Sequence, residues 1–357
     1  MRAKILYPVC ALVLFLFLCA DAYAGLVLTG SLRNDAVETI DNDPDFNDIL
    51  EGKLVLEARD GRDRWMFYSD ARVYYYYGRV AEEAGYNEVI LMRSFIRYFS
   101  TAGDFTVGKT YINLGNPGVF NIFEFDKSLR LNDLSYDREG ILAAEYVCYC
   151  GSSFEAKVYG GTYHRDRDEY SAASHCAGFS LRGNTGLFDF GLAGNRLDSN
   201  RNLAGLFFKG DAGVGLNGSW ALHFDDSGRK AFHEAGAGID YSFVEGRLVT
   251  SLQLYYNENG AEKTGVHDIS PDYYFSSQYY AYMNMTGKID EFLSLKADLF
   301  ANMVDGSLLF IPGSRFVVAD GLALEIQVFV PTGKGDAEFS QDTYGYAGTL
   351  IRVEGKF

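Results

Sequence analysis

Residues 322–330 read Leu-Ala-Leu-Glu-Ile-Gln-Val-Phe-Val, and their alternation decides the fold. The even-numbered residues from Leu322 to Val330 are all apolar, whereas Glu325 and Gln327 stand at odd-numbered positions. Side chains two residues apart in a β-strand point to the same face. This stretch therefore predicts a strand with one apolar and one polar face.

The same period of two recurs along the whole chain after residue 24. Residues 90–98 are a second example, in which Ile90, Met92 and Ile96 are expected to oppose Arg93 and Arg97. We mark 18 segments, starting near residues 24, 48, 64, 90, 104, 139, 153, 173, 186, 202, 214, 232, 246, 276, 291, 306, 320 and 343. Most have about 10–13 residues, the length that crosses a bilayer when a strand is tilted. The pattern predicts an all-β, antiparallel transmembrane barrel of about 18 strands, with 16 as the alternative count.

The connections between these segments support a barrel in a membrane. Long gaps, such as 34–47, 79–89, 113–138 and 259–275, alternate with tight gaps, such as 60–63, 102–103 and 212–213. Long loops on one side and short turns on the other are typical of outer-membrane barrels. A soluble β-sandwich or propeller is the competing interpretation, and it explains neither the long segments nor this alternation.

The N-terminus predicts export. Arg2 and Lys4 precede an apolar run from Val9 to Cys19, and Ala22-Tyr23-Ala24 supplies the small residues of a cleavage site. Residues 1–24 are therefore predicted to be a signal peptide, and residues 25–357 a single barrel domain. No later apolar stretch is long enough for a spanning helix. The formal net charge of −16 argues against nucleic acid as a partner, because phosphates attract Lys and Arg.

Charged residues on the predicted polar faces suggest where a pore would narrow. The basic residues Lys53, Arg72, Arg93 and Arg97 come from neighbouring segments, and the longest gap, 113–138, carries acids. These acids are Glu124, Asp126, Asp133 and Asp137. If this loop folds into the barrel, opposite charges would face each other across a constriction and sort solutes by charge. In the alternative, the bases pair with wall acids such as Asp70 and Glu57.

Two stretches resemble known outer-membrane proteins. Residues 107–121 read Val-Gly-Lys-Thr-Tyr-Ile-Asn-Leu-Gly-Asn-Pro-Gly-Val-Phe-Asn, similar to the strand and loop of bacterial porins and alginate-export-like barrels. Lys109 and Leu114 stand where Arg and Trp are more usual in that pattern, and Ile122 where Pro is. The apolar face that ends at Phe357 resembles the C-terminal signal that the barrel assembly machinery reads. Gly355 departs from that signal, which prefers an aromatic or apolar residue.

The resemblance implies a channel in the bacterial outer membrane for passive diffusion of small hydrophilic or charged solutes. It also implies contact with outer-membrane lipid and lipopolysaccharide, and it allows a homotrimer. No cofactor, metal site or catalytic residue is expected. The alternatives are a non-conducting structural or adhesion barrel and, from another class, a barrel enzyme with a site at its rim, where all five histidines are expected.

Three further features leave alternatives open. The tyrosine run 74–77 and the aromatics of 273–282 fit interfacial girdles, or else a track inside the pore on which sugars stack. Asp41, Asp43 and Asp45 open like a calcium loop, but Phe46 stands where such a loop needs Gly. Cys148 and Cys150 would share a strand face about 7 Å apart, too far for an easy disulfide, with a metal pair as the alternative.

Overall fold

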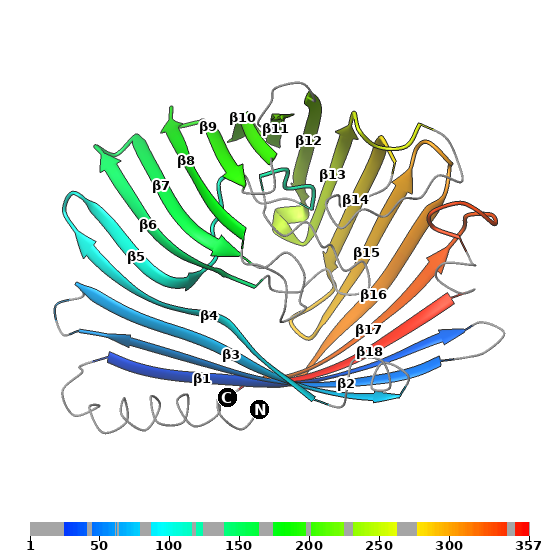
Figure 1. Ribbon diagram of the computed structural model, residues 1–357. Helices are drawn as coiled ribbons and strands as arrows, with labels where there is room; N and C mark the ends of the chain where they lie inside the picture. Colours follow the sequence, from blue (N-terminus) through cyan, green and yellow to red (C-terminus); the bar gives the residue numbers. More distant parts are fainter. Residues whose placement is uncertain are drawn as a thin grey trace.

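The computed structural model is a closed barrel of 18 antiparallel strands (Figure 1). It describes residues 25–40, 45–60, 62, 64–78, 87–115, 119–123, 139–163, 174–197, 201–224, 231–262, 277–340 and 347–356. The strands are β1 (Gly25–Ile40), β2 (Asp45–Arg59), β3 (Trp65–Gly78), β4 (Asn87–Ser100), β5 (Gly103–Thr110), β6 (Ile141–Cys150), β7 (Phe154–Tyr163), β8 (Ser174–Asn184), β9 (Phe188–Leu197), β10 (Arg201–Asp211), β11 (Gly215–Phe224), β12 (Ala231–Phe243), β13 (Leu248–Asn257), β14 (Tyr279–Lys288), β15 (Leu293–Asn302), β16 (Leu308–Ala319), β17 (Leu322–Pro331) and β18 (Ala347–Lys356). The predicted fold class and strand count are confirmed.

Each strand pairs with its sequence neighbours, and β1 closes the ring by pairing with β18 from Ser31–Lys356 to Ile40–Ala347. Closure leaves no unpaired strand edge. An ion pair bridges this seam, because Arg352 Nε donates to Asp35 Oδ1 at 2.8 Å and Arg352 Nη2 donates to Oδ2 at 3.0 Å. Both side chains are buried, so the seam is held by side chains as well as by the backbone ladder.

Short turns join the strands at one end of the barrel, as predicted. Two of them are residues 212–214 and 320–321, where Gly213 and Gly321 have φ values of +87° and +76°. Glycine reaches this left-handed region without a steric penalty. A 3-10 turn, η2 (Val244–Gly246), joins β12 to β13. Among the described residues, no helix is long and apolar enough to cross a membrane.

One predicted loop is wrong. Residues 34–47 were expected to be a long connection, but β1 continues to Ile40 and β2 begins at Asp45, so only residues 41–44 join them. Arg33 and Asp35 share one face of β1, and Asn34 lies on the other. The strand period therefore continues beyond residue 33, where the strand was expected to end. Asp41 and Asp43 of the calcium-like pattern lie outside the described residues.

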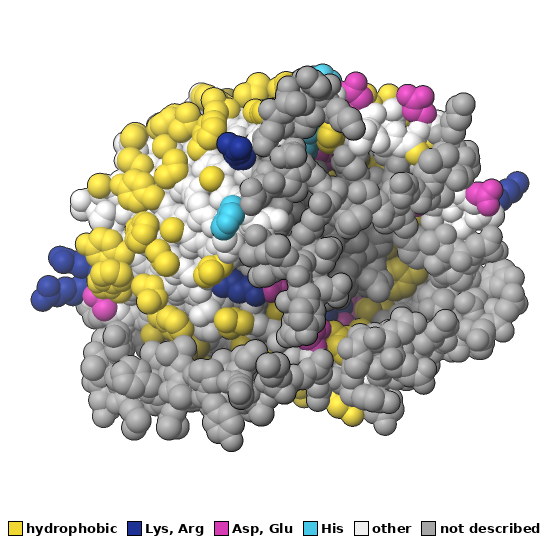
Figure 2. Space-filling view, viewed as in Figure 1, with side chains coloured by type: hydrophobic (Ala, Val, Ile, Leu, Met, Phe, Trp, Pro, Cys, Tyr) yellow, Lys and Arg dark blue, Asp and Glu magenta, His cyan; other side chains and the backbone are white. Residues whose placement is uncertain are grey.

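The outer surface of the barrel is apolar, as expected of a face in contact with lipid. Outward side chains on β6, β7 and β10 are exposed, including Leu142 at 62%, Val158 at 53% and Leu206 at 57%. Figure 2 shows hydrophobic side chains gathered over the outside of the strands at the left of the view. Inward positions on the same strands are buried, for example Glu145 and Tyr159.

A β-bulge changes the face of two residues from the predicted one. Asp70 of β3 pairs with Arg93, but the next residue, Ala71, pairs with Leu91, so Met92 is an extra residue on β4. An extra residue in one strand reverses the alternation on one side of it. Ile90 and Met92 were expected to face outward with Ile96. They are instead buried in a cluster with Tyr74 and Tyr76, whereas Ile96 is 51% exposed.

Candidate functional site: a charged inner wall and an inward segment

The inner faces of β2, β3 and β4 carry a cluster of charges around Asp70. The register places Lys53 opposite Arg72, and Asp70 opposite Arg93. The Asp70 carboxylate lies 3.2 Å from Arg93 Nη2, 3.5 Å from Arg72 Nε and 3.7 Å from Lys53 Nζ. Its side chain is 0% exposed. A carboxylate this buried requires opposite charges around it, and the three bases supply them.

The charges continue across the barrel seam. Arg33 Nη2 lies 3.0 Å from Asp35 and 3.2 Å from Glu51, and Glu51 in turn accepts from Arg72 at 3.3 Å. On the other side of the seam, Arg315 contacts Glu354 at 3.0 Å, and Arg352 lies 3.6 Å from Glu325. We call this set the charged wall: Arg33, Asp35, Glu51, Lys53, Asp70, Arg72, Arg93, Arg315, Glu325, Arg352 and Glu354.

The four predicted basic residues are brought together only in part. Lys53, Arg72 and Arg93 meet at Asp70, as the alternative based on wall acids predicted. Arg97 has different partners: its Nε donates to Thr106 Oγ1 at 2.9 Å, and its guanidinium lies 5.4 Å from the centre of the Phe95 ring. Among the described residues it meets a hydroxyl and a ring rather than a carboxylate.

Sequence reasoning missed the part of the wall on β1. Asp35 fell in the stretch 34–47 that was expected to be a loop, and Arg33 directly before it, so their inward position was not predicted. The signal that could have revealed them is the continued alternation through residues 31–36, in which Arg33 and Asp35 keep the inward phase of Ser31.

The long connection after β5 folds against the inside of the barrel in its described parts, residues 111–115 and 119–123. Its apolar side chains belong to one buried cluster with inward side chains of the barrel strands. Those at most 5% exposed are Ile112, Leu114, Phe120, Ile122 and Phe123. The segment is drawn in teal inside the ring in Figure 1. The described parts of this connection therefore narrow the space inside the barrel.

Specific contacts fix this inward segment to β10 and β13. Gln253 Oε1 accepts the backbone N–H of Val119 at 3.1 Å and that of Phe120 at 3.5 Å. The Phe120 ring stacks on Tyr255 with centroids 5.0 Å apart, and Phe123 meets Phe207 edge-on at 5.8 Å. Apolar and aromatic contacts therefore hold the segment, together with Gln253 and with Lys157, whose Nζ donates to Asn113 O at 3.3 Å. The position of Gln253 in the pattern gave no signal of this role.

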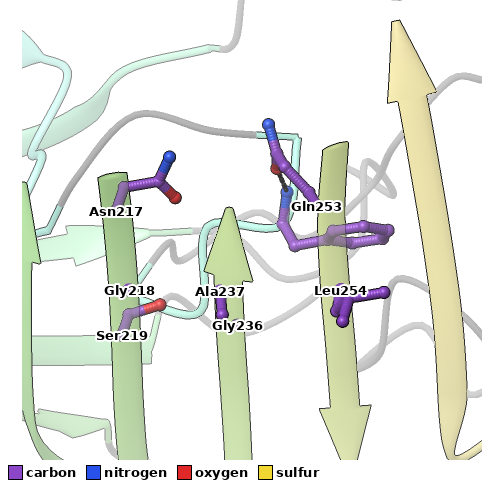
Figure 3. Close-up of a pocket in the computed structure, with 8 residues that line it drawn as sticks. Asn217, Gly218, Ser219, Gly236, Ala237, Gln253 and Leu254 are labelled. Atoms are coloured by element: carbon purple, nitrogen blue, oxygen red, sulfur yellow. Dashed lines mark hydrogen bonds between the residues drawn. The ribbon is translucent and has the colours of Figure 1, made fainter. Parts of the chain in front are cut away.

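A small pocket lies between the inward segment and the strands β11, β12 and β13 (Figure 3). It is lined by Phe120, Asn217, Gly218, Ser219, Gly236, Ala237, Gln253 and Leu254. A Cβ on Gly236 would stand 3.6 Å from Phe120 O and 3.4 Å from Ser219 Oγ. Both are ordinary van der Waals distances, so a methyl group at position 236 would fit in this pocket.

A second connection also turns inward. In residues 332–340, which follow β17, Phe339 and Ser340 are 0% exposed. Glu338 accepts a hydrogen bond from Tyr280 Oη and another, at 2.8 Å, from Asn302 Nδ2. This segment and the inward segment after β5 both pack on inner side chains of the same part of the barrel.

The loop acids proposed for the opposite side of the constriction lie outside the described residues. These are Glu124, Asp126, Asp133 and Asp137. The predicted signal peptide, residues 1–24, lies outside them as well, and so do Phe357, His164 and His267. Of the remaining histidines, His175 and His233 are exposed. His223 Nε2 lies 2.6 Å from Glu234 Oε2.

The aromatic residues divide between the two faces. Tyr75 and Tyr279 face outward, 42% and 47% exposed, and Tyr256 packs beside Tyr279 with ring centroids 5.1 Å apart. Several inward tyrosines, among them Tyr159, Tyr280 and Tyr282, are at most 5% exposed, whereas Tyr149 on β6 faces inward and is 45% exposed. The outward rings fit an interfacial girdle. The buried inner rings offer no free face to a sugar, but the exposed inward ring of Tyr149 does, so the sugar-stacking track stays a prediction.

A closed 18-strand barrel with an apolar exterior, a charged inner wall and an inward-folded segment has the architecture of a porin-type channel. Solved structures that it resembles include OmpF of Salmonella typhi in complex with daunomycin, with a TM-score of 0.56 at 10% identity over 95% of this chain and 99% of that one. For Pseudomonas aeruginosa OccK5 (OpdH) the TM-score is 0.65 at 7% identity, over 94% and 99%.

The outer membrane protein OpdK of Pseudomonas aeruginosa gives a TM-score of 0.63 at 11% identity, over 94% of this chain and 99% of that one. These neighbours are bacterial outer-membrane porins and channels, and the similarity extends over nearly the whole of each chain. No family model and no curated protein matches the sequence. At this identity the comparisons establish the fold.

Proposed function

We propose that this protein is a channel of the bacterial outer membrane through which small hydrophilic or charged solutes diffuse passively. The observation that carries the proposal is the charged wall, because eleven ionisable side chains line the inside of a barrel whose outside is apolar. Charged groups gathered on an inner face are expected where that face meets water. The fold shared with bacterial porins supports the same function.

The selectivity of the channel is proposed to reside at a constriction between the wall and the connection 113–138. Lys53, Arg72, Arg93 and Arg97 form its basic side. Asp70 and Glu51 offset only part of that charge, and Arg97 is bound to a hydroxyl. The acids Glu124, Asp126, Asp133 and Asp137 would form the opposite side. Such a transverse field orders water and discriminates between solutes by charge and dipole.

The export and assembly of the chain follow from the same proposal. Residues 1–24 would direct the chain across the inner membrane, and Phe357 would be read by the barrel assembly machinery. The outward rows would then contact lipid and lipopolysaccharide, either in a monomer or in a homotrimer. Cross-linking of the protein in native membranes distinguishes these two states.

A non-conducting structural barrel is the second candidate. It is favoured by the two inward segments, whose side chains are buried against the wall and fill part of the interior. An enzyme is a weaker alternative. The described residue pair it would use, His223 and Glu234, is joined to Tyr255, which packs under the inward segment rather than at an open cleft.

Single-channel recording in planar bilayers tests the proposal. Purified protein should insert and produce discrete current steps in potassium chloride. Steps that are absent from protein shown to be folded by its heat-dependent gel mobility would refute the channel and favour the structural barrel.

A further inference from the structure

Cys148 and Cys150 form a pair of thiols on the outer face of β6, next to the short turn 151–153. Their Sγ atoms are 3.9 Å apart. Cys150 is exposed and Cys148 is partly exposed, whereas the third described cysteine, Cys176, is buried. This is less than the separation of about 7 Å expected from strand spacing, so the two side chains lean toward each other.

The surroundings of the pair leave the sulfurs accessible. Cys148 is flanked in the ladder by Gly103 and Ala156, neither of which has a side chain longer than a methyl group. Tyr149, between the two cysteines, points to the inner face, where its hydroxyl donates to Asp104 Oδ2 at 2.9 Å. Cys150 stands opposite Phe154 in the ladder but is itself exposed at the last position of β6, so an ion can approach the sulfurs from the side of the turn.

The geometry suits a bridging metal ion better than a disulfide. Alternate residues of a strand stand roughly 6.6–6.8 Å apart, whereas a disulfide requires Cβ atoms about 3.5–4.5 Å apart. Two thiolates on a tetrahedral zinc ion, each at about 2.3 Å, lie about 3.8 Å from each other. The observed separation of 3.9 Å is close to that value.

We propose that Cys148 and Cys150 form a binding site for a thiophilic divalent metal ion such as Zn²⁺ or Cd²⁺. Binding breaks two S–H bonds, forms two metal–sulfur bonds and releases two protons to the solvent, with no change in oxidation state. Water from the side of the turn 151–153 completes the coordination, because Cys150 is the last residue of β6. Affinity should fall as the pH is lowered, since protons compete with the metal for the thiolates.

Metal titration of the folded protein in detergent tests this site. The reduced, metal-free protein is titrated with Cd²⁺ and followed by the ultraviolet charge-transfer band of cadmium thiolate, and with Zn²⁺ in competition with a chromophoric chelator. We expect one ion per chain for the wild type and for the control Cys176→Ser. We expect Cys148→Ser and Cys150→Ser each to weaken binding by at least about tenfold, the loss seen when even a group supporting a ligand is removed.

A second measurement on the wild-type protein avoids dependence on variants. Maleimide labelling of the folded chain should modify Cys148 and Cys150, leave the buried Cys176 unmodified and abolish the charge-transfer band. The proposal is overturned if the reduced wild type binds no ion, if Cys176→Ser loses binding to the same extent, or if intact mass shows a Cys148–Cys150 disulfide in the isolated protein. None of these outcomes depends on whether the barrel conducts.

Discussion

Neutralising Arg93 and Arg97 together should shift the channel toward cations. Glutamine is the appropriate replacement, because Arg93 lies 3.2 Å from the fully buried carboxylate of Asp70. A glutamate at position 93 would place a second carboxylate beside it. With Arg93→Gln, Asp70 retains Arg72 at 3.5 Å and Lys53 at 3.7 Å, so the barrel should still fold.

The size of the effect follows from Coulomb's law in water. At about 8 Å, each unit charge acts on a monovalent ion with roughly 0.5 kcal/mol. At about 0.01 M salt, where the Debye length is about 30 Å, roughly three-quarters of this remains, so that two charges contribute about 0.8 kcal/mol, or about a fourfold rise in local cation concentration. At physiological salt only about a third remains, and the rise falls to about twofold.

The assay is the reversal potential of single channels across a potassium chloride gradient, measured at low and at high salt. The matched control is Lys288→Gln with Lys296→Gln, which removes two bases from β14 and β15, outside the Asp70 cluster. Both pairs change the net charge equally. The reasoning is refuted if the control shifts the reversal potential as much as the arginine pair does, or if the arginine pair has no effect at low salt while the channel conducts.

Three other outcomes are expected. Gln253→Leu should loosen the inward segment, because it leaves the N–H groups of Val119 and Phe120 unpaired at a cost of about 1–3 kcal/mol each. The variant channel should therefore give larger, noisier currents. Unchanged currents, or the same change in the control Gln327→Leu, would contradict the anchoring role. Ile351→Arg, on the exposed outer face in mid-strand, should destabilise the barrel by about 2–4 kcal/mol. Gln327→Arg, which faces inward, should cost much less; equal costs in urea unfolding in lipid would mean that no bilayer surrounds these strands. The unboiled protein should migrate differently from the boiled one on a detergent gel, and recovery as a soluble protein without detergent would rule out a membrane barrel.

The fold could be read from the sequence because a strand in a barrel has two different solvents on its two faces. The alternation at residues 322–330 is visible in the chain itself, and it is repeated in all 18 strands. The short turns could also be predicted, because tight turns favour glycine at positions such as Gly213 and Gly321. Strand ends were less certain, because β1 and β2 continue beyond the expected apolar segment, where period two alone does not mark a boundary.

The alternation also predicts which residues of a strand share a face. It does not predict the position at which the inward and outward residues exchange faces. The bulge at Met92 turns Ile90 inward, although the sequence shows an unbroken apolar pattern there. A bulge depends on how two strands pair, and the register of that pairing cannot be predicted from the sequence of either strand alone.

From the sequence alone we could predict the class of fold, a count of about 18 strands, the apolar face of most strands and the presence of bases on β2 to β4. How these bases are used follows from contacts that only the folded barrel makes. Three of them surround the buried Asp70, Arg97 turns to Thr106, and Gln253 holds the inward segment. The reason is physical: periodicity reports the solvent that each face meets, whereas ion pairs and loop contacts join residues far apart in the chain, and only closure of the barrel brings those residues together.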